Sequence, residues 1–70
     1  MVTTVLERYD SESGQFAEIK RCPDGDIIAS LYGSSFEPIL ERVTTSVSFA
    51  RKTIEAHISK PYTKTTLKEV

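Results

Sequence analysis

The chain has 70 residues, of which 39% are hydrophobic and 27% charged, and its formal net charge is −1 at pH 7. So short a chain forms one domain at most, and its single cysteine, Cys22, excludes an internal disulfide. The near-neutral charge gives no overall attraction to nucleic acid or acidic membranes, and no apolar run approaches the roughly 20 residues of a membrane span.

The first half of the chain predicts a three-stranded antiparallel meander. β-branched, aromatic and other apolar residues mark out residues 3–9, 15–21 and 27–32. Two short turns separate these strands, residues 10–14 and the run Pro23-Asp24-Gly25, and the glycines of both turns can take a positive φ. The third strand is apolar at nearly every position, so we expect it to be central and covered by a helix on one face.

The middle of the chain carries an apolar stripe at helical spacing. Its members are Phe36, Leu40, Val43, Val47, Ala50, Ile54 and then His57 or Ile58. Steps of four and three residues place them on one face, which predicts one long helix that ends near Ser59, before Pro61.

Two starts for this helix stay open. Ser34 and Glu37 form a capping box, whereas a cap at Glu37 would place Pro38 at the first helical position. A break near Thr45 also stays open, because residues 43–49 are poor helix formers and alternate as a strand does.

The tail, residues 61–70, is rich in lysine and threonine. It is compatible with a fourth, edge strand, whose lysines would resist pairing with other chains, and equally with disorder. The sequence therefore predicts an α+β fold, a three-stranded antiparallel meander packed on one long α-helix. Residues 1–60 form the single domain, and residues 61–70 form a polar tail.

Residues that could carry chemistry are few and isolated. The single histidine, His57, lies in the last turn of the predicted helix, where a cation is mildly favoured. Cys22 is followed by Asp24 and Asp26, whose negative charge blunts a thiolate, and these aspartates lack the further ligands of a calcium loop. We therefore expect no enzyme, no cofactor and no metal site.

Charge is distributed unevenly along the chain. Residues 1–41 hold eight acidic against three basic residues, a net −5, and residues 42–70 hold six basic against two acidic residues, a net +4. The halves can simply attract each other, or the basic half can serve a small nucleic-acid-associated regulator. The second alternative is the weaker one, because Arg42 and Arg51 fall about 180° apart on a helix and no aromatic residues interleave the bases.

Phe49 is the residue that most suggests an interface. It lies roughly 135° from the centre of the apolar stripe, on a face shared with Thr45, Lys52 and Ala56. Either the tail covers it, through Tyr62 or Leu67, or a partner does. We expect these four residues and Arg42 to bind a protein partner or a second copy in a homodimer, since a domain without disulfide or metal gains from further burial.

The run from Pro23 to Gly33 reads PDGDIIASLYG and precedes a helix with an acidic start through Glu41 and Ala50. This pattern resembles many short proteins encoded by bacteriophages and prophages, which carry a DG-x-I-A hairpin strand and then one amphipathic helix. The resemblance covers about half the chain, and the alanine-rich helix of those proteins is missing here. It implies a non-enzymatic accessory or inhibitor protein that binds a partner such as a host protein, and it carries over no functional residues.

The location that we expect is cytoplasmic. Residues 1–9 lack a basic segment followed by an apolar core, the pattern of a secretory signal. A lone free cysteine also suits a reducing compartment.

Overall fold

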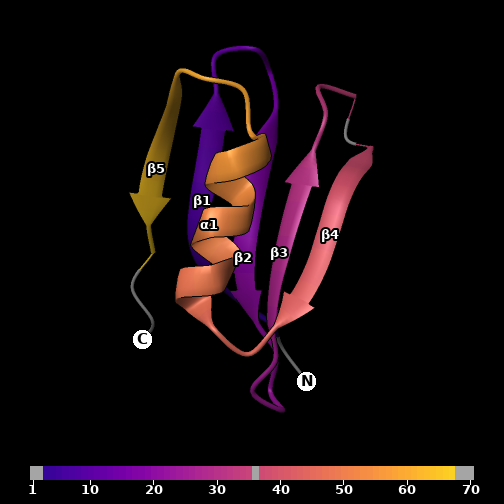
Figure 1. Cartoon of the computed structure of the whole chain (residues 1–70), viewed down its shortest axis with the longest axis vertical. Coiled ribbons are helices and arrows are strands. Elements are labelled where there is room, and N and C mark those ends of the chain that lie inside the picture. Colours follow the sequence, from indigo (N-terminus) through magenta and orange to yellow (C-terminus); the bar gives the residue numbers. More distant parts are fainter. Residues whose placement is uncertain (1–2, 36, 68–70) are drawn as a thin grey trace.

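The computed structural model describes residues 3–35 and 37–67, which form a five-stranded antiparallel sheet with one helix on one of its faces (Figure 1). The elements in chain order are β1 (Thr4–Ser11), β2 (Phe16–Arg21), β3 (Ile27–Tyr32), β4 (Pro38–Thr44), α1 (Val47–His57) and β5 (Tyr62–Thr66). The sheet order is β4-β3-β2-β1-β5, so the first four strands form a meander and β5 returns to pair with β1. The predicted α+β class and the edge strand from the tail are confirmed.

The predicted long helix is wrong in its first half, where β4 pairs with β3. Leu40 lies opposite Leu31, and Val43 lies opposite Ile28. Positions 40 and 43 therefore point to opposite faces of a strand, and the four-three spacing that suggested one helical face breaks here. Phe36, the first member of the stripe, lies outside the described residues.

Tertiary pairing explains why residues 38–44 form a strand. β3 carries apolar residues on both faces, and a strand beside it satisfies the backbone groups that an edge position would leave to water. Ile39, Val43 and Thr44 are β-branched and favour this conformation.

The second half of the stripe is helical, as predicted. Ser46, and neither Ser34 nor Glu37, caps the helix: its Oγ accepts a hydrogen bond from the Phe49 N–H at 3.2 Å. The break near Thr45, which the sequence left open, is confirmed, because β4 ends at Thr44 and α1 begins at Val47. At the other end the Ile58 N–H donates to the Ile54 carbonyl, and the helix ends at His57.

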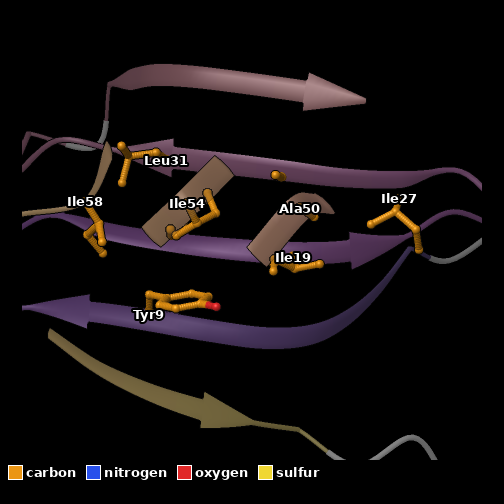
Figure 2. Packing of buried hydrophobic residues seen from close by; sticks show 9 residues of the cluster. Tyr9, Ile19, Ile27, Leu31, Ala50, Ile54 and Ile58 are labelled. Atoms are coloured by element: carbon orange, nitrogen blue, oxygen red, sulfur yellow. The ribbon is translucent and has the colours of Figure 1, made fainter. Parts of the chain in front are cut away.

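The core lies between α1 and the face of the sheet that it covers (Figure 2). We call this the covered face. Its buried hydrophobic residues are Tyr9, Ala17, Ile19, Ile27, Ala29, Leu31, Ala50, Ile54 and Ile58. Ile58 is the buried end of the apolar stripe, whereas His57 is exposed.

Both hairpin turns adopt the predicted conformation. Gly14 has φ +98° and Gly25 has φ +99°, a region that residues with a Cβ rarely adopt. In the second turn the Gly25 N–H donates to the Cys22 carbonyl and the Asp26 N–H donates to Asp24 Oδ1. Within residues 3–35 and 37–67, no helix is long and apolar enough to cross a membrane.

Candidate functional site

Within the described residues, the face of the sheet opposite α1 carries no helix, and we call it the open face (Figure 1). Because directly paired residues point to the same side of a sheet, the register defines three rows of side chains across it. The aromatic row is Thr63, Asp10, Phe16, Tyr32 and Pro38; the charged row is Thr65, Arg8, Glu18, Ser30 and Glu41; the aliphatic row is Val5, Lys20, Ile28 and Val43.

The aromatic row is anchored by a stacked pair. The ring centroids of Phe16 and Tyr32 lie 4.8 Å apart with 19° between the ring planes. The Arg8 guanidinium lies 5.1 Å from the centroid of Phe16, and its Nε donates to Asp10 at 3.2 Å. Stacking and cation–π contact fix these side chains on a face that no other described element of the chain covers.

The charged and aliphatic rows combine buried and exposed positions. Ser30 is 1% exposed and its Oγ donates to Glu41 at 3.5 Å, while Val43 is 60% exposed. The formal charges on the open face come from Arg8 and Lys20 against Asp10, Glu18 and Glu41. Their sum of −1 gives this face no attraction for the phosphates of a nucleic acid.

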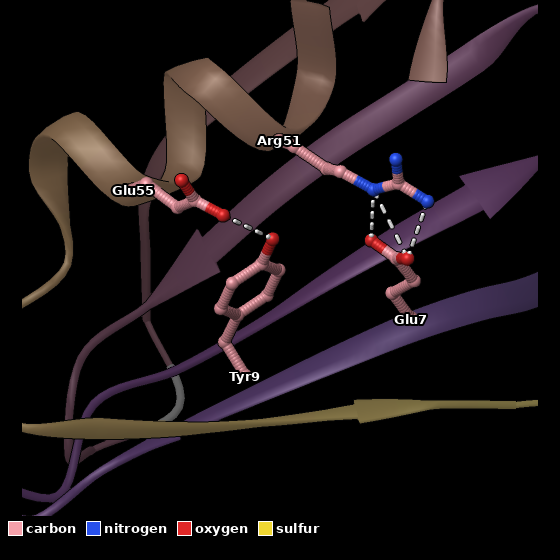
Figure 3. A network of polar contacts seen from close by, with 4 residues as sticks. All are labelled: Glu7, Tyr9, Arg51 and Glu55. Carbon is pink, nitrogen blue, oxygen red and sulfur yellow. Dashed lines mark hydrogen bonds and ion pairs between the residues drawn. The ribbon is translucent and has the colours of Figure 1, made fainter. Parts of the chain in front are cut away.

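A polar network ties α1 to β1 on the covered face (Figure 3). Glu7 is only 2% exposed, and its carboxylate accepts hydrogen bonds from Arg51 Nε at 2.8 Å and Arg51 Nη2 at 2.7 Å. One turn along the helix, the Tyr9 hydroxyl donates to Glu55 at 3.2 Å. The two-point contact is the geometry in which arginine holds a carboxylate most firmly.

The environment shifts the pKa values of this network. The hydrogen bonds from Arg51, helped by its charge and that of Lys64, hold the pKa of Glu7 below its ordinary value in spite of burial. The same pairing raises the pKa of Arg51. Burial, and then the negative charge of Glu55, raise the pKa of Tyr9. Glu7 therefore stays ionised and Tyr9 protonated at neutral pH, which suits structural contacts and leaves neither group ready to exchange a proton.

Phe49 lies where the helical spacing predicted, turned away from the core and 48% exposed. Arg51 and Glu55 reach β1 from one flank of α1, and Phe49 lies about 160° around the helix from Arg51. Lys52 and Ala56 are exposed and lie within about 60° of Phe49. We call these three residues the Phe49 patch.

The other predicted interface residues lie elsewhere. Thr45 is exposed in the link between β4 and α1, and Arg42 is exposed on β4, so neither shares a helix with Phe49. The idea that Tyr62 or Leu67 covers Phe49 is wrong. Tyr62 packs on Tyr9 with ring centroids 5.5 Å apart, and the Leu67 N–H bonds to the Leu6 carbonyl.

Of the two residues that could have carried chemistry, His57 has its side chain engaged in local structure. His57 Nδ1 lies 2.8 Å from the Thr53 carbonyl of its own helix and donates to it. Cys22 is partly buried at a strand end, where its N–H donates to the Asp26 carbonyl. Over the part of the chain that the structure describes, no group of His, Cys, Asp and Glu could hold a metal ion, and no cavity is found.

Sequence reasoning missed the Glu7–Arg51 pair and the open face. The pair joins residues 44 positions apart, and no local pattern announces it. The open face had a usable signal in the alternation of β2, where Phe16, Glu18 and Lys20 interleave with Ala17 and Ile19. Comparison with family models, with curated proteins and with solved structures finds no match to this chain.

Proposed function

We propose that this chain is a non-enzymatic protein-binding protein, an accessory or inhibitor that contacts its partner through the Phe49 patch. The observation that carries the proposal is the half-exposed phenylalanine on the outer flank of α1, with Lys52 and Ala56 beside it. Aromatic side chains are enriched in protein interfaces because each buries a large apolar area. Covering a phenylalanine fully is worth roughly 1.5–3 kcal/mol.

Two further observations support binding over catalysis. His57 Nδ1 donates to a backbone carbonyl of its own helix, and the ionisable pair Glu7–Arg51 is locked in a two-point contact. The resemblance of the 23–33 hairpin to phage-encoded proteins suggests a host protein as the partner. We place the protein in the cytoplasm, which the lone thiol of Cys22 supports.

The alternative role in nucleic-acid binding has less support. Arg42 lies on β4 and Lys64 on β5, the two opposite edges of the sheet, and Arg51 is paired with Glu7. Among the described residues, Arg42 and Lys64 are therefore separated by the width of the sheet, and Arg51 is held by Glu7, whereas a phosphate-binding site requires free basic side chains close together.

The test compares immobilised wild-type chain with Phe49→Lys and with Leu67→Lys as bait for host proteins. Leu67 is a second exposed apolar residue, and it follows β5 at the far edge of the sheet. We expect a specific partner to bind the wild type and Leu67→Lys, and to bind Phe49→Lys at least about tenfold more weakly in titration calorimetry. Melting curves check that both variants fold.

Two results would overturn the proposal. A partner that binds Phe49→Lys as tightly as wild type excludes the Phe49 patch. Failure to capture any protein, together with retention on heparin at moderate salt, favours the nucleic-acid role instead.

A further inference from the structure

We propose that the open face is the interface of a homodimer, in which two sheets pack face to face about a two-fold axis that runs parallel to the strands between β2 and β3. This inference concerns a different surface from the Phe49 patch and does not rest on the proposed function. The sequence alone led us to expect a homodimer through Phe49, and we now propose that self-association uses the side of the sheet opposite α1.

The first argument is that one layer is missing. A sheet buries its apolar side chains against another layer, and here α1 covers only one face. Val43 is the most exposed large hydrophobic residue of the described chain, and Phe16, Ile28 and Tyr32 are only partly buried on the same face. A second sheet packed about 10 Å away is the usual way to cover such a face.

The second argument is that the charges select the symmetry axis. A two-fold axis that runs perpendicular to the strands, along the charged row, sets each member of that row near the same residue of the second copy. Glu41 then lies near Glu41. An axis along β2 sets Glu18 on Glu18. Like charges directly opposed across an interface cost several kcal/mol in specificity.

An axis between β2 and β3 avoids these clashes. With this axis, each row of one copy lies over the same row of the other copy. Strand β1 of one copy faces β4 of the other, and β2 faces β3. Arg8 of one copy then faces Glu41 of the other, and Glu18 lies over the buried Ser30 instead of over another carboxylate. Two-fold symmetry makes the contact between Arg8 and Glu41 twice.

The same axis sets apolar side chains of the other two rows opposite one another, except that Asp10, which stays bound to Arg8, lies opposite Pro38 and Lys20 lies opposite Ile28. Phe16 faces Tyr32 of the second copy, so the stacked pairs of both chains form one aromatic cluster at one end of the interface. Val5 faces Val43 at the other end. Lys20 faces Ile28 near the end of the sheet, where its stem can pack on the isoleucine while the ammonium reaches water.

The size of the patch sets the expected affinity. Four strands roughly 4.8 Å apart and three rows roughly 6.8 Å apart span about 400 Å² of flat area per copy. Stable interfaces bury about 800 Å² of accessible surface per partner. The accessible area of this patch is larger than its flat area, because side chains project from the sheet, but the interface is still small. We therefore expect a dimer with a dissociation constant in the micromolar range.

The test is a charge swap measured by sedimentation of the full chain over a range of concentrations. Arg8 and Glu41 lie three strands apart within one chain, roughly 14 Å, too far for direct contact. R8E and E41R should each weaken dimerisation by at least about tenfold, because each sets like charges together across the interface. An equimolar mixture of R8E and E41R should dimerise again, since both cross-interface contacts are then of opposite charge.

The controls separate this surface from others. Lys52→Glu and Phe49→Ser lie on α1 and should leave the dissociation constant unchanged. Melting curves of R8E are compared with wild type, because that variant also loses the contact of Arg8 with Asp10.

Three results would overturn the proposal. The first is a wild-type chain that remains monomeric at the highest concentration, which would leave the open face to some other occupant. The second is a mixture of R8E and E41R that fails to dimerise, which would mean that the charge reversals act within each chain. The third is loss of the dimer in Phe49→Ser, which would move the interface to the helix.

Discussion

The two faces of the sheet are built from the same strands but differ in how far their side chains are buried. On the covered face, β2 and β3 place Ala17, Ile19, Ala29 and Leu31 under α1, and all are buried. On the open face the alternate positions of β2 are Phe16, Glu18 and Lys20, which stay partly exposed. A shift of one position along a strand therefore moves a side chain from the core to a surface that can meet a partner. The predictions below test this division, from the largest expected effect to the smallest.

The largest effect should come from a charge on the covered face. Ile54 is fully buried, so Ile54→Asp would bury an unpaired carboxylate at a cost of several kcal/mol, against a total stability of about 3–5 kcal/mol for so small a domain. We expect this variant to be unfolded by far-UV circular dichroism at room temperature.

Ile28→Lys is the matched change on the open face. Ile28 is only partly buried, and a lysine there can reach water, so a loss of about 1 kcal/mol is expected in urea titrations. Val47→Asp should also be milder than Ile54→Asp, because Val47 is partly exposed at the N-terminus of α1, where a carboxylate is favoured. Equal losses for Ile54→Asp and Ile28→Lys would contradict the division between the faces.

The second prediction concerns the charged part of the covered face. Arg51→Met leaves the buried carboxylate of Glu7 without its partner, whereas Glu7→Leu with Arg51→Met removes both charges. Breaking a buried pair costs more than replacing it with apolar residues. We therefore expect the single variant Arg51→Met to melt at a lower temperature than the double variant, and an inverse order would show that the pair contributes little.

The acid side of the stability curve reports on the same pair. The pKa of Glu7 is below its ordinary value of 4.5 in the folded protein, so the stability from the pair is fully present above that value. It is lost as pH falls through the lower folded pKa. Urea midpoints of Glu7→Gln should therefore decline less on acidification than those of wild type.

Local pattern was sufficient for the turns, the first three strands and the second half of the helix. It failed at residues 38–44, where helical spacing and strand alternation were both present and only pairing with β3 decided between them. Glu7 is another case. A glutamate in the middle of a strand indicates an exposed position, and its burial depends on Arg51, 44 residues away. Phe49 could be placed from the sequence because the wheel of α1 alone determines which way it points.

The third prediction concerns the glycines of the two hairpin turns, where a substitution changes the free energy of unfolding without altering either face of the sheet. Gly25 has φ +99° with nothing within 4 Å of an added Cβ, so Gly25→Val should cost about 1 kcal/mol or more from backbone strain alone. Gly14→Val should cost more, because an added Cβ would also lie 3.1 Å from the Cβ of Ser34. Urea titrations that rank Gly25→Val above Gly14→Val would mean that the Ser34 contact relaxes freely.

The smallest predicted effect concerns the hydroxyl of Tyr9. Tyr9 is fully buried on the covered face and donates to Glu55, which is exposed. At neutral pH Tyr9→Phe removes one hydrogen bond to an exposed carboxylate and should cost about 1 kcal/mol or less.

The difference grows in alkali. Burial and the charge of Glu55 raise the pKa of Tyr9 above its ordinary value of 10.0. The unfolded chain ionises this tyrosine from about that pH upward, while the folded chain keeps it protonated. The stability that depends on the protonated hydroxyl is therefore complete below pH 10.0 and is lost as pH rises toward the folded pKa. Urea midpoints of Tyr9→Phe should fall less steeply above that pH than those of wild type. If Tyr9→Phe and wild type instead give the same alkaline slope, the hydroxyl of Tyr9 is reached by water, and the covered face is less tightly closed at β1 than its contacts with Glu55 and Tyr62 indicate.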